Sequence, residues 1–301
     1  MRAQQVLDAG TSIWLDDLSR AKISGDDSHS LPSRIATSGV VGVTTNPSIF
    51  SAAISGAAEY SADIAQMMGA SVDDVVKKLT TDDVRQACDL FTQIYTSSKG
   101  VDGRVSIEVD PRLAHDTEGT IAAGKELWKI IDRPNVMIKV PATPGGLAAL
   151  EELCAAGITL NCTLIFSERQ YLEARAAIWR GAQRRTSLEN FKSVYSIFVS
   201  RLDVYTEQHV PTLSAEAQGM VGIVNAKRLC AMNHKFWADK NLPLQQEIIF
   251  ASTGTKKPSD APYKYVAAFA GSDIETNPPE TNDATQNSGQ VFTKQVDVLP
   301  A

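Results

Sequence analysis

A lysine stands inside a short apolar run of this sequence. Lys139 follows Val136-Met-Ile and precedes Val140, which places it within an expected buried strand rather than on a solvated face. Burial disfavours the charged form of an amine, and the neutral amine is the form that attacks a carbonyl carbon. Lys139 is therefore a candidate Schiff-base nucleophile. The alternative is a lysine held in a structural salt bridge or reaching the rim of the fold.

Polar side chains also stand in or just after the other short apolar runs. If these runs are parallel strands, their C-terminal ends meet at one face of the sheet or barrel. We therefore expect the side chains to share one site with Lys139. The set comprises Asp16, Thr44, Asn46, Glu108, Asn161, Thr163, Ser196, Arg201 and Lys256.

This set of side chains suits imine chemistry on a phosphorylated carbonyl compound. Asp16 and Glu108 supply carboxylates that can move protons while a carbinolamine forms and loses water. The neutral amides and hydroxyls of the set can orient substrate hydroxyl groups without adding charge. Arg201 and Lys256 can hold an anionic group, and the arginine fork matches phosphate oxygens.

The elements that position these residues alternate along the whole chain. Runs rich in β-branched residues predict strands at 12–16, 40–45, 104–109, 136–140, 158–163, 194–199 and 247–252, with an eighth candidate at 272–277. Helical spacing predicts helices at 49–68, 71–95, 112–131, 145–156 and 167–185, and one or two over 202–240. Repeated strand–helix alternation implies a parallel sheet. No Pro/Ser-rich linker divides the chain, so a single α/β domain over residues 1–301, a (β/α)₈ TIM-type barrel with additional helices, is favoured over two doubly wound domains.

Composition and motifs exclude several other classes of protein. Lys plus Arg number 29 against 35 Asp plus Glu, a formal charge of −6, which argues against a nucleic-acid partner. The sequence has no apolar run of 18 residues and no secretory signal at its start, and its four cysteines form no C-x-x-C pair. We therefore expect no membrane partner and a cytoplasmic location.

Resident metal or nucleotide cofactors are not expected either. The four histidines are scattered and form no H-E-x-x-H motif. The glycine-rich signatures of dinucleotide-binding and P-loop proteins are also missing from the sequence. The prediction is a protein without a metal site or cofactor.

Two segments of the sequence resemble signatures of the transaldolase family. Gly42–Phe50 (GVTTNPSIF) is similar to the first signature, and Val136–Thr143 (VMIKVPAT) is similar to the active-site lysine motif. The resemblance extends from about residue 7 to about residue 283. Supporting matches occur in the same order at 12–20, 108–110, 161–164 and 196–201.

The resemblance implies a fold and an activity. It implies a cofactor-free (β/α)₈ enzyme of the pentose phosphate pathway. Such an enzyme transfers a dihydroxyacetone unit from sedoheptulose 7-phosphate to glyceraldehyde 3-phosphate, giving erythrose 4-phosphate and fructose 6-phosphate. The expected partners are therefore phosphorylated ketose and aldose substrates, and the chain is expected to be a monomer or a homodimer.

The resemblance also implies roles for individual residues. Lys139 would form the Schiff base, and Asp16 would exchange a proton with the hydroxyl beside the carbon–carbon bond that breaks. Glu108 and Thr163 would position a water molecule. The implied substrate-binding side chains are Thr44, Asn46, Asn161, Ser196, Phe198, Arg201 and Lys256.

Some points depart from the family pattern and leave alternatives open. Many members carry arginine where this chain has Lys256, and Lys257 is an alternative phosphate ligand. A related fructose-6-phosphate aldolase-type lyase has tyrosine in place of Phe198, and a non-catalytic sugar-phosphate-binding barrel is a further alternative. Residues 284–301 form a polar segment, expected to be irregular and to lack the family's C-terminal helix.

Overall fold

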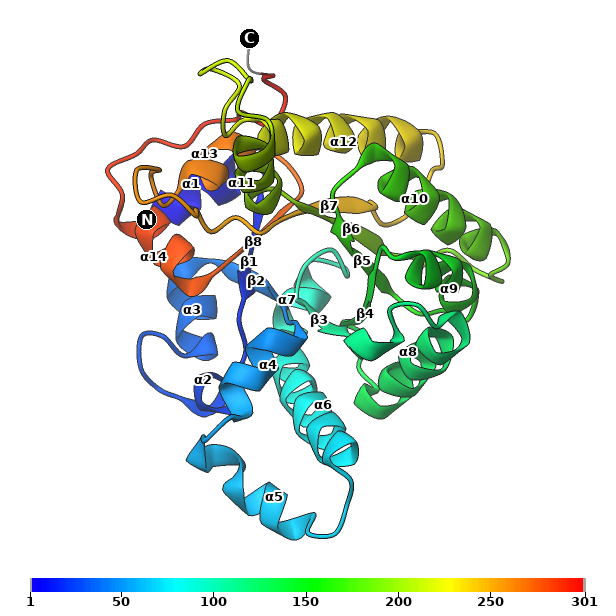
Figure 1. Ribbon diagram of the computed structural model, residues 1–301. Helices are drawn as coiled ribbons and strands as arrows, with labels where there is room; N and C mark the ends of the chain where they lie inside the picture. The colour runs from blue at the N-terminus through cyan, green and yellow to red at the C-terminus, as the bar shows by residue number, and fades with distance from the viewer. Residues whose placement is uncertain (1, 300–301) are drawn as a thin grey trace.

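A computed structural model describes residues 2–299, and in it eight parallel strands close into a barrel (Figure 1). Neighbours around the barrel follow the order of the sequence, and β8 pairs with β1 to close it. The strands are β1 (Ser12–Asp16), β2 (Val40–Thr44), β3 (Arg104–Glu108), β4 (Val136–Pro141), β5 (Leu160–Ile165), β6 (Ser193–Phe198), β7 (Glu247–Ala251) and β8 (Ile274–Asn277). The predicted (β/α)₈ architecture is thus confirmed, including the eighth strand candidate.

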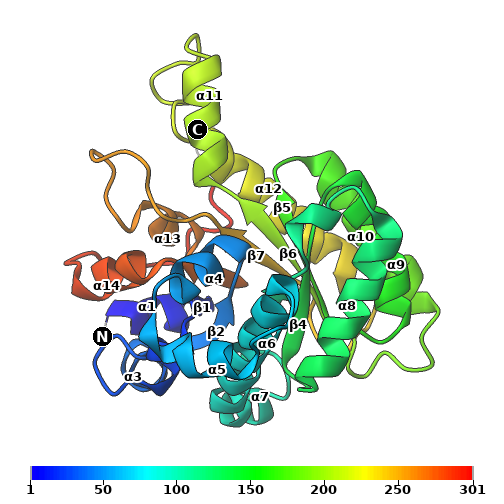
Figure 2. The same ribbon diagram turned by 60° about the horizontal axis from the view of Figure 1, so that its bottom comes forward.

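Helices surround the barrel on its outside. The helices α8, α9 and α10 lie side by side along one flank in both views, whereas α11 stands out from the barrel in Figure 2. The helices are α1 (Arg2–Asp8), α2 (Arg20–Ser24), α3 (Leu31–Ser38), α4 (Pro47–Ile54), η1 (Ala58–Tyr60), α5 (Ser61–Gln66), α6 (Val72–Leu90), α7 (Thr92–Ser97), η2 (Pro111–Leu113), α8 (Thr117–Ile131), α9 (Pro144–Ala155), α10 (Glu168–Gln183), α11 (Ser200–His209), α12 (Val221–Ala238), α13 (Lys264–Phe269) and α14 (Pro279–Asn287).

Three of the predicted helices are wrong as single elements. The one expected over 112–131 consists of the end of η2 and, after a break at 114–116, α8. The expected helix over 49–68 is divided into α4, η1 and α5, because Gly56 adopts a left-handed φ of 73° after the end of α4. The expected helix over 71–95 is divided at Phe91 into α6 and α7. One or two helices were expected over 202–240, and the region forms two, α11 and α12.

The barrel interior is filled by a small apolar cluster. The indole of Trp14 lies against the backbone of Gly42 on the neighbouring strand, so that any Cβ at position 42 would collide with the ring. The larger apolar core lies between the strands and the surrounding helices. The interior cluster comprises Trp14, Met137, Val194, Ile249, Ala251 and Ile274. This packing closes the barrel below the C-terminal ends of its strands and leaves those ends for polar side chains.

The end of the chain runs along the outside of the barrel. The expectation of an irregular segment over 284–301 is wrong for its first four residues, because α14 continues to Asn287. Residues 288–299 contain neither helix nor strand, and residues 300–301 lie outside the described part of the chain. Phe292 and Val296 are nevertheless buried, and the amides of Gln295 and Val296 donate to the carbonyl of Ala270. The C-terminal segment, residues 288–299, is therefore packed against the fold by apolar anchors.

Within residues 2–299, no helix is both long enough and apolar enough to cross a membrane.

Candidate active site

A cavity of about 870 Å³ lies at the C-terminal ends of the barrel strands. Its walls come from all eight strands and from the segments that follow them, so residues far apart in sequence face one space. The residues proposed from sequence that line it are Asp16, Thr44, Asn46, Glu108, Lys139, Thr163, Ser196, Phe198, Arg201 and Lys256. The exception is Asn161, which lies behind the wall of the cavity.

Lys139 is the buried cation of this cavity. Lys139 is 5% exposed, and its Nζ donates a hydrogen bond to the carbonyl oxygen of Thr45 at 3.0 Å. The same Nζ lies 3.3 Å from Oε2 of Glu108. Glu108 on β3 and Asn161 on β5 pair in register with Lys139 on β4, which fixes the three residues side by side. An amine and a carboxylate that can exchange a proton are thus in contact inside the cavity.

Asp16 is the second carboxylate, at the end of β1. Its Oδ1 accepts a hydrogen bond of 2.6 Å from the Thr44 hydroxyl, which lies 2.6 Å from the hydroxyl of Thr276. Burial raises the pKa of Asp16, and the positive charge of Lys139 and the Thr44 hydrogen bond only partly oppose that shift. The neighbouring Asp17 instead forms an ion pair with Lys22. Of the two adjacent carboxylates, Asp16 is therefore the one that interacts with Lys139.

Asn161 is fully buried and uses both halves of its side-chain amide within the protein. Its Oδ1 accepts a hydrogen bond of 2.8 Å from the Ser196 hydroxyl, and its Nδ2 donates to Oγ of Ser106 at 3.1 Å. Because the Ser196 hydroxyl donates its hydrogen bond to Asn161, the Ser196 oxygen remains an acceptor toward the cavity. Asn161 therefore orients Ser196 rather than lining the space itself.

Asn46 is the N-cap residue of α4, which limits how its side chain can bind a ligand. Its Oδ1 accepts a hydrogen bond of 3.0 Å from the amide of Ile49 and so caps α4, with Pro47 at the first helical position. The cap leaves the Asn46 amide NH₂ group as the part that can donate to a substrate oxygen.

Thr163 lies at an irregularity of β5. The register of β5 against β6 shifts between Cys162 and Ile165, and Leu164 within this stretch has a φ of 58°. Both Thr163 and Leu164 line the cavity. Among the described residues the buried Thr163 hydroxyl has no hydrogen-bond partner. A buried hydroxyl without a partner is suited to a ligand or a water molecule.

The cationic side chains lie at the more open part of the cavity. Arg201 and Lys256 are exposed lining residues, and the Arg201 guanidinium lies 5.2 Å from the centroid of the Phe198 ring. Phe198 is itself packed at 5.3 Å, between ring centroids, against Phe166. Lys257, the alternative to Lys256, forms an ion pair with Glu207 and is not among the residues that line the cavity.

Sequence reasoning missed some lining residues. Thr276 could have been found, because it is a polar residue near the end of the eighth strand candidate, as Asp16 and Thr44 are on theirs. Tyr60 and Lys22 also line the cavity from η1 and α2. No short motif marks those two residues, because they reach the cavity only through the packing of helices beside it.

The chain matches one family and several named proteins over most of its length. The family described as "Transaldolase/Fructose-6-phosphate aldolase" matches residues 13–299. A protein named "Transaldolase" from Mycobacterium tuberculosis is 43% identical over 302 residues, covering 94% of this chain and 80% of the relative. Proteins of the same name from Mycolicibacterium smegmatis and Saccharopolyspora erythraea are each 42% identical, covering 94% and 96% of this chain and 80% and 82% of the relatives.

Proposed function

Because this chain belongs to the transaldolase/fructose-6-phosphate aldolase family, we propose that its transaldolase reaction proceeds through a Schiff base on Lys139. The chain is an enzyme, a transferase of the pentose phosphate pathway that acts on phosphorylated sugars. It transfers a dihydroxyacetone unit from sedoheptulose 7-phosphate to glyceraldehyde 3-phosphate, giving erythrose 4-phosphate and fructose 6-phosphate.

The observation that supports this proposal best is the contact between Lys139 and Glu108. An amine that is 5% exposed, 3.3 Å from a carboxylate, inside a cavity of about 870 Å³, is suited to attack a ketose carbonyl. Glu108 first accepts a proton from the Lys139 ammonium group, Nζ bonds to the carbonyl carbon, and Glu108 passes that proton to the carbonyl oxygen, giving a carbinolamine once the nitrogen loses its extra proton to Glu108. Glu108 then gives this second proton to the hydroxyl, which leaves as water, and the protonated imine remains.

The Thr163 hydroxyl supports this dehydration. Thr163 lines the same cavity as Glu108 and has no hydrogen-bond partner among the described residues. Its hydroxyl can hold the water that is released when the protonated imine forms, and can hold it again when the imine is hydrolysed at the end. The water thereby remains beside the carboxylate that transfers its proton.

Asp16 acts in the carbon–carbon step. It removes the proton of the sugar hydroxyl next to the breaking bond, the bond electrons move into the protonated imine, and the aldose leaves. The resulting enamine on Lys139 then attacks the second aldose, and Asp16 returns its proton to the new hydroxyl. The raised pKa of Asp16, caused mainly by burial, suits a group that must both take and give a proton.

The remaining lining side chains hold the substrate. Thr44, Asn46 and Ser196 present a hydroxyl, an amide NH₂ and a hydroxyl oxygen to the dihydroxyacetone unit. Arg201 and Lys256, at the open part of the cavity, bind the phosphate group. Asn161 holds Ser196 in position, and the Phe198 ring forms the apolar wall beside Arg201.

The proposal is tested by trapping the imine. Wild-type protein incubated with fructose 6-phosphate and borohydride should carry a reduced three-carbon adduct, which peptide mass spectrometry places on Lys139. The variant Lys139→Met should carry none. Lys22→Met is the matched control, because Lys22 lines the same cavity and pairs with Asp17. An unmodified Lys139 in the wild type, or an adduct that persists in Lys139→Met, would contradict the proposal.

The aldolase alternative is not favoured by the comparisons, since the relatives are named "Transaldolase". The two activities differ in their need for an acceptor. With fructose 6-phosphate as donor, dihydroxyacetone transfer should require added erythrose 4-phosphate, and release of free dihydroxyacetone without acceptor should be much slower. Equal rates with and without the acceptor would instead indicate an aldolase.

We also propose a cytoplasmic location and a monomeric or homodimeric state. The location is supported by the four cysteines, all of which are free thiols, as is usual in a reducing compartment. Light scattering coupled to gel filtration measures the mass in solution and distinguishes the monomer from the dimer.

A further inference from the structure

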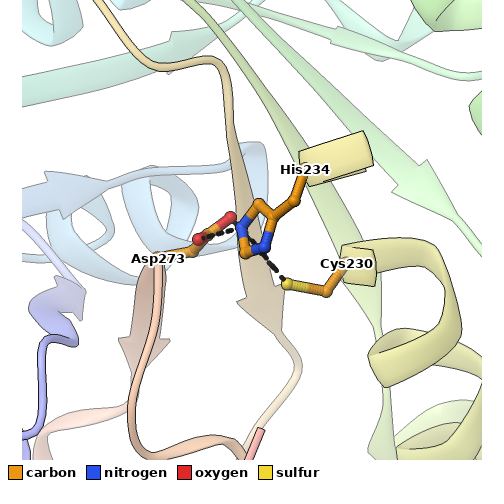
Figure 3. A group of neighbouring side chains, drawn as sticks. All are labelled: Cys230, His234 and Asp273. Carbon is orange, nitrogen blue, oxygen red and sulfur yellow. Dashed lines mark hydrogen bonds and ion pairs between the residues drawn. The ribbon is translucent and has the colours of Figure 1, made fainter. Parts of the chain in front are cut away.

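Three side chains that the transaldolase reaction does not use meet at the opposite face of the barrel. Cys230 and His234 stand four residues apart on α12 and so share one face of the helix. Asp273 directly precedes β8, at the end of the strands remote from the cavity, and points toward both of them (Figure 3). His234 and Asp273 are 39 positions apart in sequence, so only the fold brings this cluster together.

The distances within the cluster are close to those around a bound metal ion. Nε2 of His234 lies 3.7 Å from Sγ of Cys230 and 2.6 Å from Oδ1 of Asp273, and Sγ lies 4.0 Å from Oδ2 of Asp273. Around a tetrahedral zinc ion, bonds of about 2.3 Å to sulfur and 2.0 Å to nitrogen or oxygen place the ligand atoms about 3.3–3.6 Å apart. One donor atom from each of the three side chains lies within 4.8 Å of the other two, so small side-chain shifts convert the cluster into a coordination triangle.

The protein holds the ligands in orientations suited to coordination. Oδ2 of Asp273 accepts the amide hydrogen of Ile248 at 2.7 Å, which fixes the carboxylate and turns Oδ1 toward His234. Ser272 and Gln245 also donate to Oδ1, so the carboxylate is held from several sides. Such outer hydrogen bonds to a ligand carboxylate strengthen metal binding.

The charge of the cluster favours a divalent cation. Cys230 and Asp273 are 2% and 4% exposed, and as thiolate and carboxylate they carry two negative charges that a divalent ion balances in this buried place. The carboxylates of Asp297 and Glu247 add to the negative field around the cluster. Lys294 acts in the other direction on Cys230. The local potential is one that attracts a cation.

We propose that Cys230, His234 and Asp273 form a binding site for Zn²⁺ or a similar thiol-seeking divalent ion. A ligand set of sulfur, imidazole nitrogen and carboxylate oxygen selects zinc over calcium or magnesium, which prefer oxygen alone. Binding replaces two protons by metal bonds, the thiol proton of Cys230 and the proton on Nε2 of His234. The thiol proton leaves to solvent, and the ring proton leaves to solvent or is replaced by one on Nδ1. The His234 side chain is 36% exposed, which gives the ion a path inward and leaves a fourth position for water.

A metal ion there would join three parts of the fold. It would link α12 to the start of β8, and α12 also holds the C-terminal segment, because Lys227 donates to the carbonyls of Gln295 and Val298 at 2.8 and 2.6 Å. An ion that binds only the folded chain stabilises it by mass action. Zinc should therefore raise the melting temperature, and its site lies on the face remote from the catalytic cavity.

The test is a direct measurement of metal binding by the full chain, freed of metal by a chelator. Titration with zinc against a chromophoric chelator should give one tight site per chain. Cobalt should produce the near-ultraviolet charge-transfer band of a thiolate ligand. Cys230→Ser and His234→Gln should each weaken zinc binding at least tenfold, and Cys230→Ser should remove the band. Cys154→Ser is the matched control, since Cys154 is a buried free thiol outside the cluster.

The outcomes separate the site from general binding to exposed histidines and carboxylates. Wild-type binding no tighter than that of the two variants, or a cobalt band that survives in Cys230→Ser, would overturn the proposal. Far-ultraviolet circular dichroism of the variants shows that each is folded when binding is measured. His234→Gln keeps the buried thiol and carboxylate in place, so it tests the site even if Cys230→Ser fails to fold.

Discussion

The carboxyl group of Asp16 is kept in a place where its negative charge is disfavoured. Burial raises its pKa despite the nearby Lys139 and the hydrogen bond from Thr44. A carboxyl group whose pKa is raised in the folded state destabilises the fold at neutral pH, because the unfolded chain loses the proton more readily than the folded protein does. The proton transfer assigned to Asp16 and the instability it brings therefore have one origin.

The variant Asp16→Asn separates these two effects. It should lower kcat by at least about a hundredfold, because an amide cannot exchange the proton. It should also raise the melting temperature at pH 7, because the disfavoured charge is gone, and this gain should vanish below the ordinary aspartate pKa. Steady-state kinetics and thermal unfolding at the two pH values measure both effects. A variant that is less stable than wild type at pH 7 would contradict the account of Asp16.

Lys256 and Lys257 are adjacent in sequence and differ in their surroundings. Lys256 lines the cavity, whereas Lys257 is paired with Glu207. Lys256→Gln should raise KM for the sugar phosphates by about tenfold with a smaller change in kcat, because a charge-assisted hydrogen bond to phosphate is lost. Lys257→Gln should change neither constant more than twofold. The reverse pattern in steady-state kinetics would make Lys257 the phosphate ligand.

At the scale of single elements, β8 carries an unusual buried acid. Glu275 is fully buried, and neither of its carboxyl oxygens has a hydrogen-bond partner among the described residues. Burial raises its pKa well above the ordinary value, so Glu275 keeps its proton to a higher pH in the folded protein than in the unfolded chain. The unfolded chain releases that proton near pH 4.5, so the free energy of unfolding falls as the pH rises from there toward the raised pKa.

The variant Glu275→Gln should remove this pH dependence. Between the two pKa values one group changes the free energy of unfolding by up to about 1.4 kcal/mol per pH unit. The variant should therefore gain stability relative to wild type between pH 5 and pH 8, measured by urea unfolding. Glu280→Gln, at an exposed residue of α14, is the control and should show no such gain. Parallel pH profiles for wild type and Glu275→Gln would show that Glu275 is ionised in the fold.

The strands were predictable from sequence because each is a short β-branched run bounded by turn residues. Lys139 could be singled out because it interrupts such a run, and Asp16 because it ends one. Helix boundaries were less accessible, since the Ala-rich segment over 49–68 has helical spacing on both sides of Gly56 and only the left-handed backbone there divides it.

The positions of individual side chains within the site were harder to predict. Strand order places Asn161 beside Lys139. Its side-chain amide, however, is hydrogen-bonded to the Ser196 and Ser106 hydroxyls and does not line the cavity. Asp17 and Lys257 differ from their neighbours only through ion pairs with residues elsewhere in the chain. Contacts of this kind depend on packing between elements, which no local pattern encodes.

At the scale of the whole molecule, both ends of the described chain lie on the outside of the barrel. Val6 of α1 and Phe292 of the C-terminal segment pack in one apolar cluster with Ile13 and Val266. The amide of Phe292 also donates to the side chain of Gln5. The helix α12 then holds the end of the segment through Lys227. The C-terminal segment is thus a strap across the seam where β8 meets β1.

The variant Lys227→Met should loosen this strap without affecting the reaction. Burial lowers the pKa of Lys227, whose amine is the donor to the Gln295 and Val298 carbonyls, and methionine fills similar space without a donor. Hydrogen exchange of residues 288–299 should become faster, whereas kcat and KM should stay as in wild type. Lys294→Met, which breaks only an exposed pair with Asp297, is the control. Unchanged exchange in Lys227→Met would show that the apolar anchors alone hold the segment.

The burial of the four thiols has a consequence for the conditions under which the enzyme works. Burial raises the pKa of every cysteine, that of Cys154 to about 11, and the described residues that line the catalytic cavity include no cysteine. Thiolates are the form that peroxides and alkylating agents attack, whereas the proposed mechanism uses an amine and two carboxylates. Turnover should therefore continue under oxidant concentrations that inactivate cysteine-dependent enzymes, and sugar carbon can still be rearranged during oxidative stress.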